Sequence, residues 1–152
     1  MPLPVVVPDA SVLLKWVLPP ADEPNADRAL HLRSAILHER IRALVPSLWF
    51  YEVGNTVARR FPEQAAQWLM SMMKFGLEEA PLSERWLTTA LGLTGRCSTS
   101  FNDAAYHAVA LVHGGVFITA DSRYALLAQK EGAVVLLNEW RPPQPQSKRR
   151  GQ

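Results

Sequence analysis

Short apolar runs alternate along the chain with longer segments in which apolar residues recur at helical spacing. Such runs are typical of strands buried on both faces of a sheet, and the segments between them are long enough for crossover helices. The predicted strands are residues 5–7, 43–45, 78–81, 116–120 and 133–137. This order of elements predicts a three-layer α/β domain with a central, mainly parallel sheet flanked by helices.

Capping and turn residues set approximate bounds for the helices. The predicted helices are residues 11–16, 26–40, 48–60, 62–75, 84–93, 101–112 and 122–132. Side chains that favour a helix N-cap precede several of them, namely Asn25, Ser47, Ser83, Ser100 and either Asp121 or Ser122. Three glycines are expected to end helices, namely Gly76, Gly95 and Gly114.

Length and composition restrict the class of protein. The chain has 152 residues, of which 48% are hydrophobic, and this suits one domain with a substantial core. We assign residues 1–140 to that domain and residues 141–152 to a basic, Pro-rich, disordered tail. The net charge of +2 does not by itself indicate nucleic-acid binding, and the single Cys97 excludes an internal disulfide. The sequence has no signal-peptide pattern and no apolar run of about 20 residues, so a soluble cytoplasmic protein is expected.

Four acidic residues stand near predicted strand–helix junctions, and each has an ordinary structural explanation. Asp9 and Asp121 directly follow predicted strands, where Asp is a favoured helix N-cap. Asp103 comes three residues after Ser100, which is the spacing of a capping box. Glu52 lies early in a predicted helix, where a solvent-facing acid is stabilised by the helix dipole.

The four acids together favour a metal site. In the predicted sheet, Asp9, Asp103 and Asp121 would crowd the same edge. Two carboxylates about 4 Å apart repel by roughly 4 kcal/mol at an effective dielectric constant near 20, and structural caps have no reason to converge against that repulsion. Oxygen ligands without a histidine or thiolate partner suit Mg²⁺ or Mn²⁺ rather than zinc. Four negative charges would balance two such ions, as in sites that hydrolyse phosphodiesters.

With their neighbours, these acids resemble the PIN-domain nucleases, most closely the VapC-type toxins of prokaryotic toxin–antitoxin pairs. The resemblance extends from Val5 to about Leu137. The residues that carry it are Asp9-Ala10-Ser11, Glu52 with Asn55, Asp103-Ala104-Ala105-Tyr106 with Ala108 and Ala110, and Thr119-Ala120-Asp121. Their order and separations make the match specific, and all four acidic positions of the family pattern are occupied.

The resemblance implies a five-stranded sheet of order 3-2-1-4-5 and a Mg²⁺-dependent endoribonuclease that cleaves RNA with metal-activated water, Mn²⁺ being a possible substitute. The implied metal ligands and catalytic residues are Asp9, Glu52, Asp103 and Asp121. Ser11, Asn55 and Thr119 are candidates for hydrogen bonds behind the ligands, although capping or local backbone bonding explains them about equally well. The implied partners are RNA, a cognate antitoxin protein and a second copy of the chain in a homodimer, with no membrane.

Two other functions remain open at the level of sequence. A non-catalytic phosphate-receiver or interaction module of similar α/β fold needs only one strand-end Asp, and it does not need Glu52 near the other acids. A DNA nuclease of the same fold would have the same metal ligands. The apolar helix face formed by Trp68, Leu69, Met72, Met73 and Phe75 is mostly explained by core packing, although Met-rich faces also suit partners.

The basic residues at the end of the 48–60 helix and in the tail are interpreted without a binding role. Arg59 and Arg60 are interpreted as a solvated helix end rather than as phosphate contacts. The basic residues 148–150 are interpreted as an inert tail rather than as a source of weak RNA attraction. No role is assigned to the four histidines, His31, His38, His107 and His113.

Overall fold

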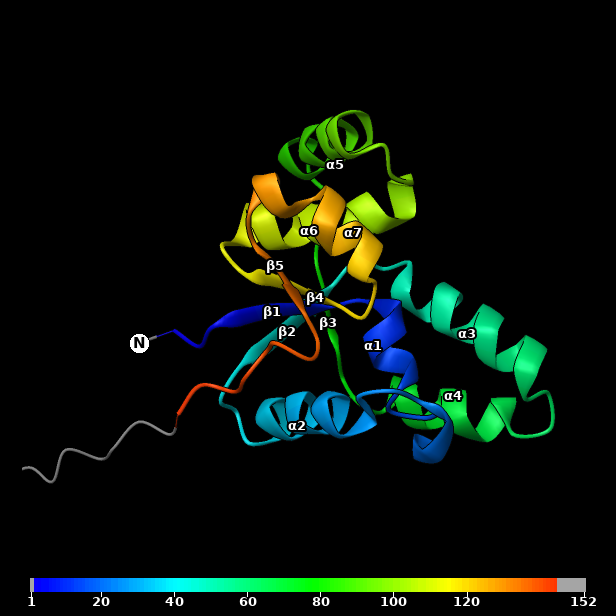
Figure 1. Ribbon diagram of the computed structural model, residues 1–152. Helices are drawn as coiled ribbons and strands as arrows, with labels where there is room; N and C mark the ends of the chain where they lie inside the picture. The colour runs from blue at the N-terminus through cyan, green and yellow to red at the C-terminus, as the bar shows by residue number, and fades with distance from the viewer. Residues whose placement is uncertain (1, 145–152) are drawn as a thin grey trace, which may run out of the picture.

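A five-stranded parallel sheet forms the centre of the protein (Figure 1). The computed structural model describes residues 2–144. The strands are β1 (Val5–Pro8), β2 (Arg42–Val45), β3 (Glu78–Glu79), β4 (Val116–Thr119) and β5 (Val134–Leu136). Their order is β3-β2-β1-β4-β5, and every neighbouring pair is parallel. Both the α/β class and the strand order 3-2-1-4-5 are therefore confirmed.

Helices cover the sheet on both sides, with α5, α6 and α7 above it and α2 below it in Figure 1. The helices are α1 (Ala10–Leu14), α2 (Ala26–Leu37), α3 (Trp49–Arg60), α4 (Ala65–Met73), α5 (Glu84–Cys97), α6 (Phe101–His113) and α7 (Ser122–Leu127). Two short 3₁₀ turns are η1 (Pro20–Asp22) and η2 (Gln129–Glu131). Across residues 2–144, none of these helices has the length and apolar character needed to span a bilayer.

Several predicted helix ends are wrong, and packing explains the clearest case. Helix α5 was expected to end before Gly95, but it continues to Cys97. A helical glycine costs only about 1 kcal/mol, whereas the longer helix buries Cys97 against the core beside Leu93. The helix then ends with Ser98 in the left-handed conformation, at φ 48°.

Other differences concern where helices begin or stop. The N-cap of α3 is Leu48 instead of Ser47, and α4 begins at Ala65 rather than near Pro62. Helix α2 ends at Leu37, and α7 ends at Leu127, after which η2 replaces its expected continuation. Within the predicted tail, residues 145–152 lie outside the described part of the chain.

Two predicted serine caps are confirmed, while Asn25 behaves differently. The hydroxyl oxygens of Ser83 and Ser100 accept backbone N–H bonds at 3.0 and 3.1 Å, and they start α5 and α6 respectively. Asn25 occupies the N-cap position of α2, but its backbone is left-handed and its side chain makes no capping bond. Helix α6 ends at Gly114 as predicted, with φ 64°.

The centre of the core lies where β1 and β4 pack under α6. Val7 and Ile118 of these neighbouring strands are fully buried. On α6, Ala104, Ala105 and Ala108 are also fully buried, and such small side chains let a helix approach a sheet closely. This packing places the first turn of α6 beside the carboxyl ends of both strands.

Gly115 allows the close approach of β4 to β1. An added Cβ would lie 2.8 Å from the carbonyl oxygen of Val5. We expect Gly115→Ala to lower the free energy of unfolding by about 1–3 kcal/mol, because the strands would have to separate. Urea denaturation measures this change. Gly95→Ala is the control: nothing lies within 4 Å of its added Cβ, so it should raise stability by about 0.5–1 kcal/mol. Equal effects at both positions would contradict the explanation.

Candidate active site

Asp9 lies at the carboxyl end of the central strand, and its carboxylate faces the neighbouring strand. Oδ2 of Asp9 accepts hydrogen bonds from Ser11 Oγ at 3.0 Å and from Thr119 Oγ1 at 2.9 Å. Asp9 occupies the N-cap position of α1, yet its side chain makes no capping bond. The capping explanation therefore does not account for the direction of this carboxylate. Instead, hydroxyls from α1 and β4 hold it at the junction of the two strands.

The electrostatic environment of Asp9 disfavours its charge. Its pKa is raised to about 6, chiefly because burial penalises the ionised form. The hydrogen bonds from Thr119 and Ser11 lower the pKa, whereas the negative charges of Asp103 and Glu52 raise it. Carboxylates from α3 and α6 therefore both act electrostatically on Asp9, which follows β1.

Glu52 is half-buried and does not simply face solvent. Tyr106 of α6 donates its hydroxyl proton to Glu52 Oε1 at 2.7 Å. The pKa of Glu52 is raised, first by burial and then by the charge of Asp103, while the Tyr106 bond acts against the rise. Burial also raises the pKa of Tyr106, which keeps its hydroxyl protonated as a donor.

Sequence reasoning assigned no role to Tyr106, which anchors Glu52. Tyr106 follows Asp103 by three residues, and that spacing puts both side chains on one face of α6. This spacing is the sequence signal that Tyr106 lies on the same side of the helix as Asp103. It did not identify Glu52 as the partner, since the two residues are 54 positions apart.

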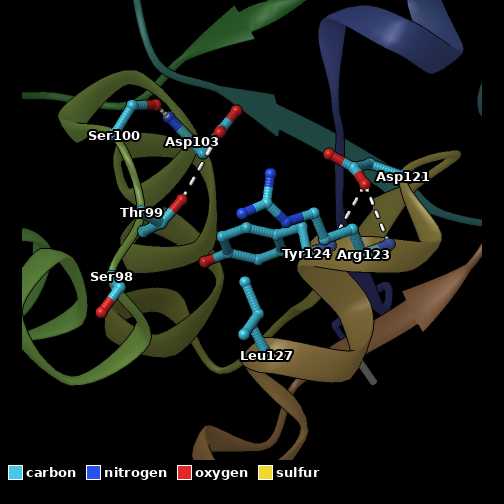
Figure 2. Close-up of a pocket in the computed structure, with 8 residues that line it drawn as sticks. All are labelled: Ser98, Thr99, Ser100, Asp103, Asp121, Arg123, Tyr124 and Leu127. Carbon is cyan, nitrogen blue, oxygen red and sulfur yellow. Dashed lines mark hydrogen bonds between the residues drawn. The ribbon is translucent and has the colours of Figure 1, made fainter.

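Asp103 stands in the first turn of α6. Its N–H donates to Ser100 Oγ at 3.1 Å, while Thr99 Oγ1 donates to Asp103 Oδ2 at 3.4 Å. Ser100 is therefore the helix cap, and the Asp103 carboxylate makes no hydrogen bond to Ser100 in return. The carboxylate lines a small cavity between α6 and α7 (Figure 2).

Asp121 is a true helix cap. Its Oδ1 accepts the N–H groups of Arg123 at 3.0 Å and Tyr124 at 3.1 Å, which starts α7. Its own N–H donates to Thr119 Oγ1 at 3.0 Å, so Thr119 joins Asp121 to Asp9. Asp121 also lines the same cavity as Asp103, whose volume is about 150 Å³. Only Oδ1 serves the cap.

Asn55 is the candidate least connected to the acids. It is exposed on α3, and its side chain has no hydrogen bond to the four acids anywhere in residues 2–144. It does line a second cavity, of about 390 Å³, together with Glu52, Tyr51 and Ala10. This cavity lies on the α1–α3 side of the site.

The donor set has the chemistry of a hard-cation site. Its side-chain donors are carboxylates and hydroxyls, and no ion pair in the described chain involves Asp9, Glu52, Asp103 or Asp121. Neighbouring negative charge contributes to the raised pKa of Asp9 and Glu52, and carboxylates without an ion-pair partner in such a place are stabilised by a divalent cation. No three acidic, histidine or cysteine side chains between residues 2 and 144 already converge closely enough to hold a metal ion.

Comparison with known proteins gives the following matches. The family model described as "PIN domain" matches residues 6–130. No curated protein matches the sequence. A toxin–antitoxin complex from Klebsiella pneumoniae contains a similar chain, with a TM-score of 0.60 and 15% identity over 87% of this chain and 97% of that one.

Two further solved structures share the fold. VapBC2 from Rickettsia felis, bound to a DNA fragment from its promoter, matches with a TM-score of 0.64 and 13% identity over 87% of this chain and 96% of that one. FitAcB from Neisseria gonorrhoeae matches with a TM-score of 0.64 and 13% identity over 89% and 99%.

Proposed function

Because the chain belongs to the PIN-domain family, whose members are nucleases, we propose that it is a Mg²⁺-dependent endoribonuclease and the toxin of a toxin–antitoxin pair. The observation that carries the proposal is that the charges of Glu52 and Asp103 act on the buried carboxyl group of Asp9. The charges of Asp103 and Glu52 raise the pKa of Asp9, and the charge of Asp103 also raises that of Glu52. The Thr119 hydroxyl donates to the Asp9 carboxylate and accepts the backbone N–H of Asp121. A phosphate-receiver module has no use for Glu52 at this place.

The four acids would hold Mg²⁺, or Mn²⁺ as a substitute, through carboxylate oxygens. A bound divalent ion would supply a nucleophile at neutral pH and neutralise charge on the phosphodiester. Ser11 and Thr119 orient Asp9 by donating to Oδ2, and Tyr106 orients Glu52 in the same way. These hydroxyls leave the second oxygen of each carboxylate free for the cation. Asn55 lines the approach beside Glu52.

The test is incubation of the purified protein with total RNA in Mg²⁺, followed by mapping of new ends. We expect discrete new RNA ends in Mg²⁺ or Mn²⁺ and none in chelator. A single-stranded DNA of matched sequence is the control that separates an RNase from a DNA nuclease. Intact RNA in both metals would contradict the proposal.

We propose further that the antitoxin lies across α3, and that the toxin forms a homodimer. Two cavities on α3 support this position for the antitoxin. One, of about 380 Å³, is lined by Tyr51 and Met73, and the other contains Glu52. Tyr51 lines both cavities and is 78% exposed, while Met73 is 65% exposed. An apolar segment that covered Tyr51 would therefore lie beside Glu52.

Tyr51→Ala should weaken antitoxin binding by about tenfold or more, because exposed aromatic anchors carry much of an interface's free energy. The measurement is calorimetric titration with the product of the adjacent small open reading frame, first tested by co-expression. Leu91→Ala is the matched control, since Leu91 is 53% exposed on α5, a different helix. Failure to form any stable complex on co-expression would count against the antitoxin proposal, and equal affinities of the two variants would count against this surface.

A further inference from the structure

The small cavity beside Asp103 and Asp121 has features beyond those needed to hold a cation. One wall is the turn between α5 and α6, residues 98–100, which presents three hydroxyl side chains. The opposite wall is the first part of α7 (Figure 2). None of the residues that line this cavity belongs to α3, the helix that carries Glu52.

Arg123 is the cation of this region. Among the described residues that line this cavity or the one at Glu52, it alone is positively charged. Figure 2 shows its guanidinium above the Tyr124 ring, between Asp103 and Asp121 in that view. No ion pair recorded for residues 2–144 involves Arg123, although both carboxylates line the same cavity. Its donors are thus available to a ligand.

The backbone that carries Arg123 is held firmly. The Arg123 N–H donates to Asp121 Oδ1, which ties its main chain to one of the acids. The next residue, Tyr124, is buried and bonded to the core. The Gly132 carbonyl can only accept a proton, so His107 Nε2 donates to it at 2.7 Å, and Nδ1 is left to accept the Tyr124 hydroxyl proton at 2.7 Å. Burial lowers the pKa of His107, which favours this neutral form.

We propose that Arg123 binds a phosphate of the RNA strand, next to the phosphate that is cleaved. This inference rests on the proposed ribonuclease function. A planar guanidinium donates two parallel bonds to phosphate oxygens, so an arginine beside the acids suits a backbone phosphate. The carboxylates would repel an anion, and a lone cation near them is the group that offsets this repulsion for the strand.

The binding test uses the full chain carrying Asp9→Asn, so that cleavage plays no part. The Kd of a labelled oligouridylate is measured at constant Mg²⁺ over a series of KCl concentrations. Arg123→Gln should weaken binding about tenfold and reduce the slope of log Kd against log salt by about 0.7, the value for one phosphate contact with a single strand. Arg123→Lys should retain most of the slope. Lys130→Gln, an exposed residue outside both cavities, removes the same charge and should change neither quantity.

A second measurement follows cleavage by the chain with Asp9 intact. Arg123→Gln should raise KM for RNA more than it lowers kcat, because the contact is to substrate. Equal salt slopes for Arg123→Gln and Lys130→Gln would overturn the inference, as would a loss confined to kcat. An inactive parent protein whose Asp9→Asn form still shows the Arg123 slope would overturn the ribonuclease proposal while supporting the phosphate contact.

Discussion

Asp9→Asn and Asp103→Asn should each reduce Mg²⁺-dependent RNA cleavage by at least about 100-fold while leaving the fold intact. Each substitution removes a negative oxygen from the proposed cation site, and loss of one electrostatic group of this kind typically costs 10²–10³-fold in rate. Asparagine keeps the size of the side chain. At position 9 it also keeps an acceptor for the hydroxyls of Ser11 and Thr119. The measurement is single-turnover cleavage of RNA together with a circular dichroism melt.

Asp27→Asn is the matched control for this experiment. Asp27 is an exposed acid in the first turn of α2, outside the cavities lined by Glu52, Asp103 and Asp121. Its replacement should leave the cleavage rate unchanged. Full activity in Asp9→Asn or Asp103→Asn would remove the assignment of the acids, and equal losses in all three variants would indicate a general charge effect.

In chelator, Asp9→Asn should stabilise the protein at pH 8 by up to about 3 kcal/mol. The pKa of Asp9 is about 6 in the folded protein and 3.8 for the ordinary group. That difference, at 1.36 kcal/mol per unit, is the cost of ionising the buried carboxyl. Between these two pH values the folded state binds more protons than the unfolded state, so stability falls as the pH rises from about 4 to about 6. Asparagine does not ionise, so the variant does not lose this stability as the pH rises.

The measurement is urea denaturation at several pH values with EDTA present. The gain from Asp9→Asn should be largest above pH 7 and small near pH 4. It should vanish below about pH 3, where the wild-type carboxyl is protonated in both states. Added Mg²⁺ should stabilise the wild type and have little effect on the variant, because a ligand stabilises only the state that binds it. A gain that is the same at pH 4 and pH 8 would contradict the ionisation cost of Asp9.

Local sequence patterns located most of the helices and strands, and also the strand–helix junctions at Asp9 and Asp121. The β-branched run before Asp9 and the apolar run before Asp121 predicted β1 and β4, and strand burial confirms them. Ser83 and Ser100 act as caps because a cap depends on residues three positions apart. Caps and apolar runs involve only residues that are close together in the sequence, so they could be recognised without knowledge of the fold.

By itself, the sequence determined approximately where the strands lie and that Asp9 and Asp121 follow two of them, because hydrophobic periodicity and capping are local properties. Only the tertiary structure decided that Asp9 bonds Thr119, 110 positions away, and that Tyr106 holds Glu52. It also decided that the side chain of Asp121 makes capping bonds whereas that of Asp9 makes none, and that α5 continues past Gly95. These outcomes depend on strand register and helix packing, which bring together groups distant along the chain, and no short-range pattern encodes them.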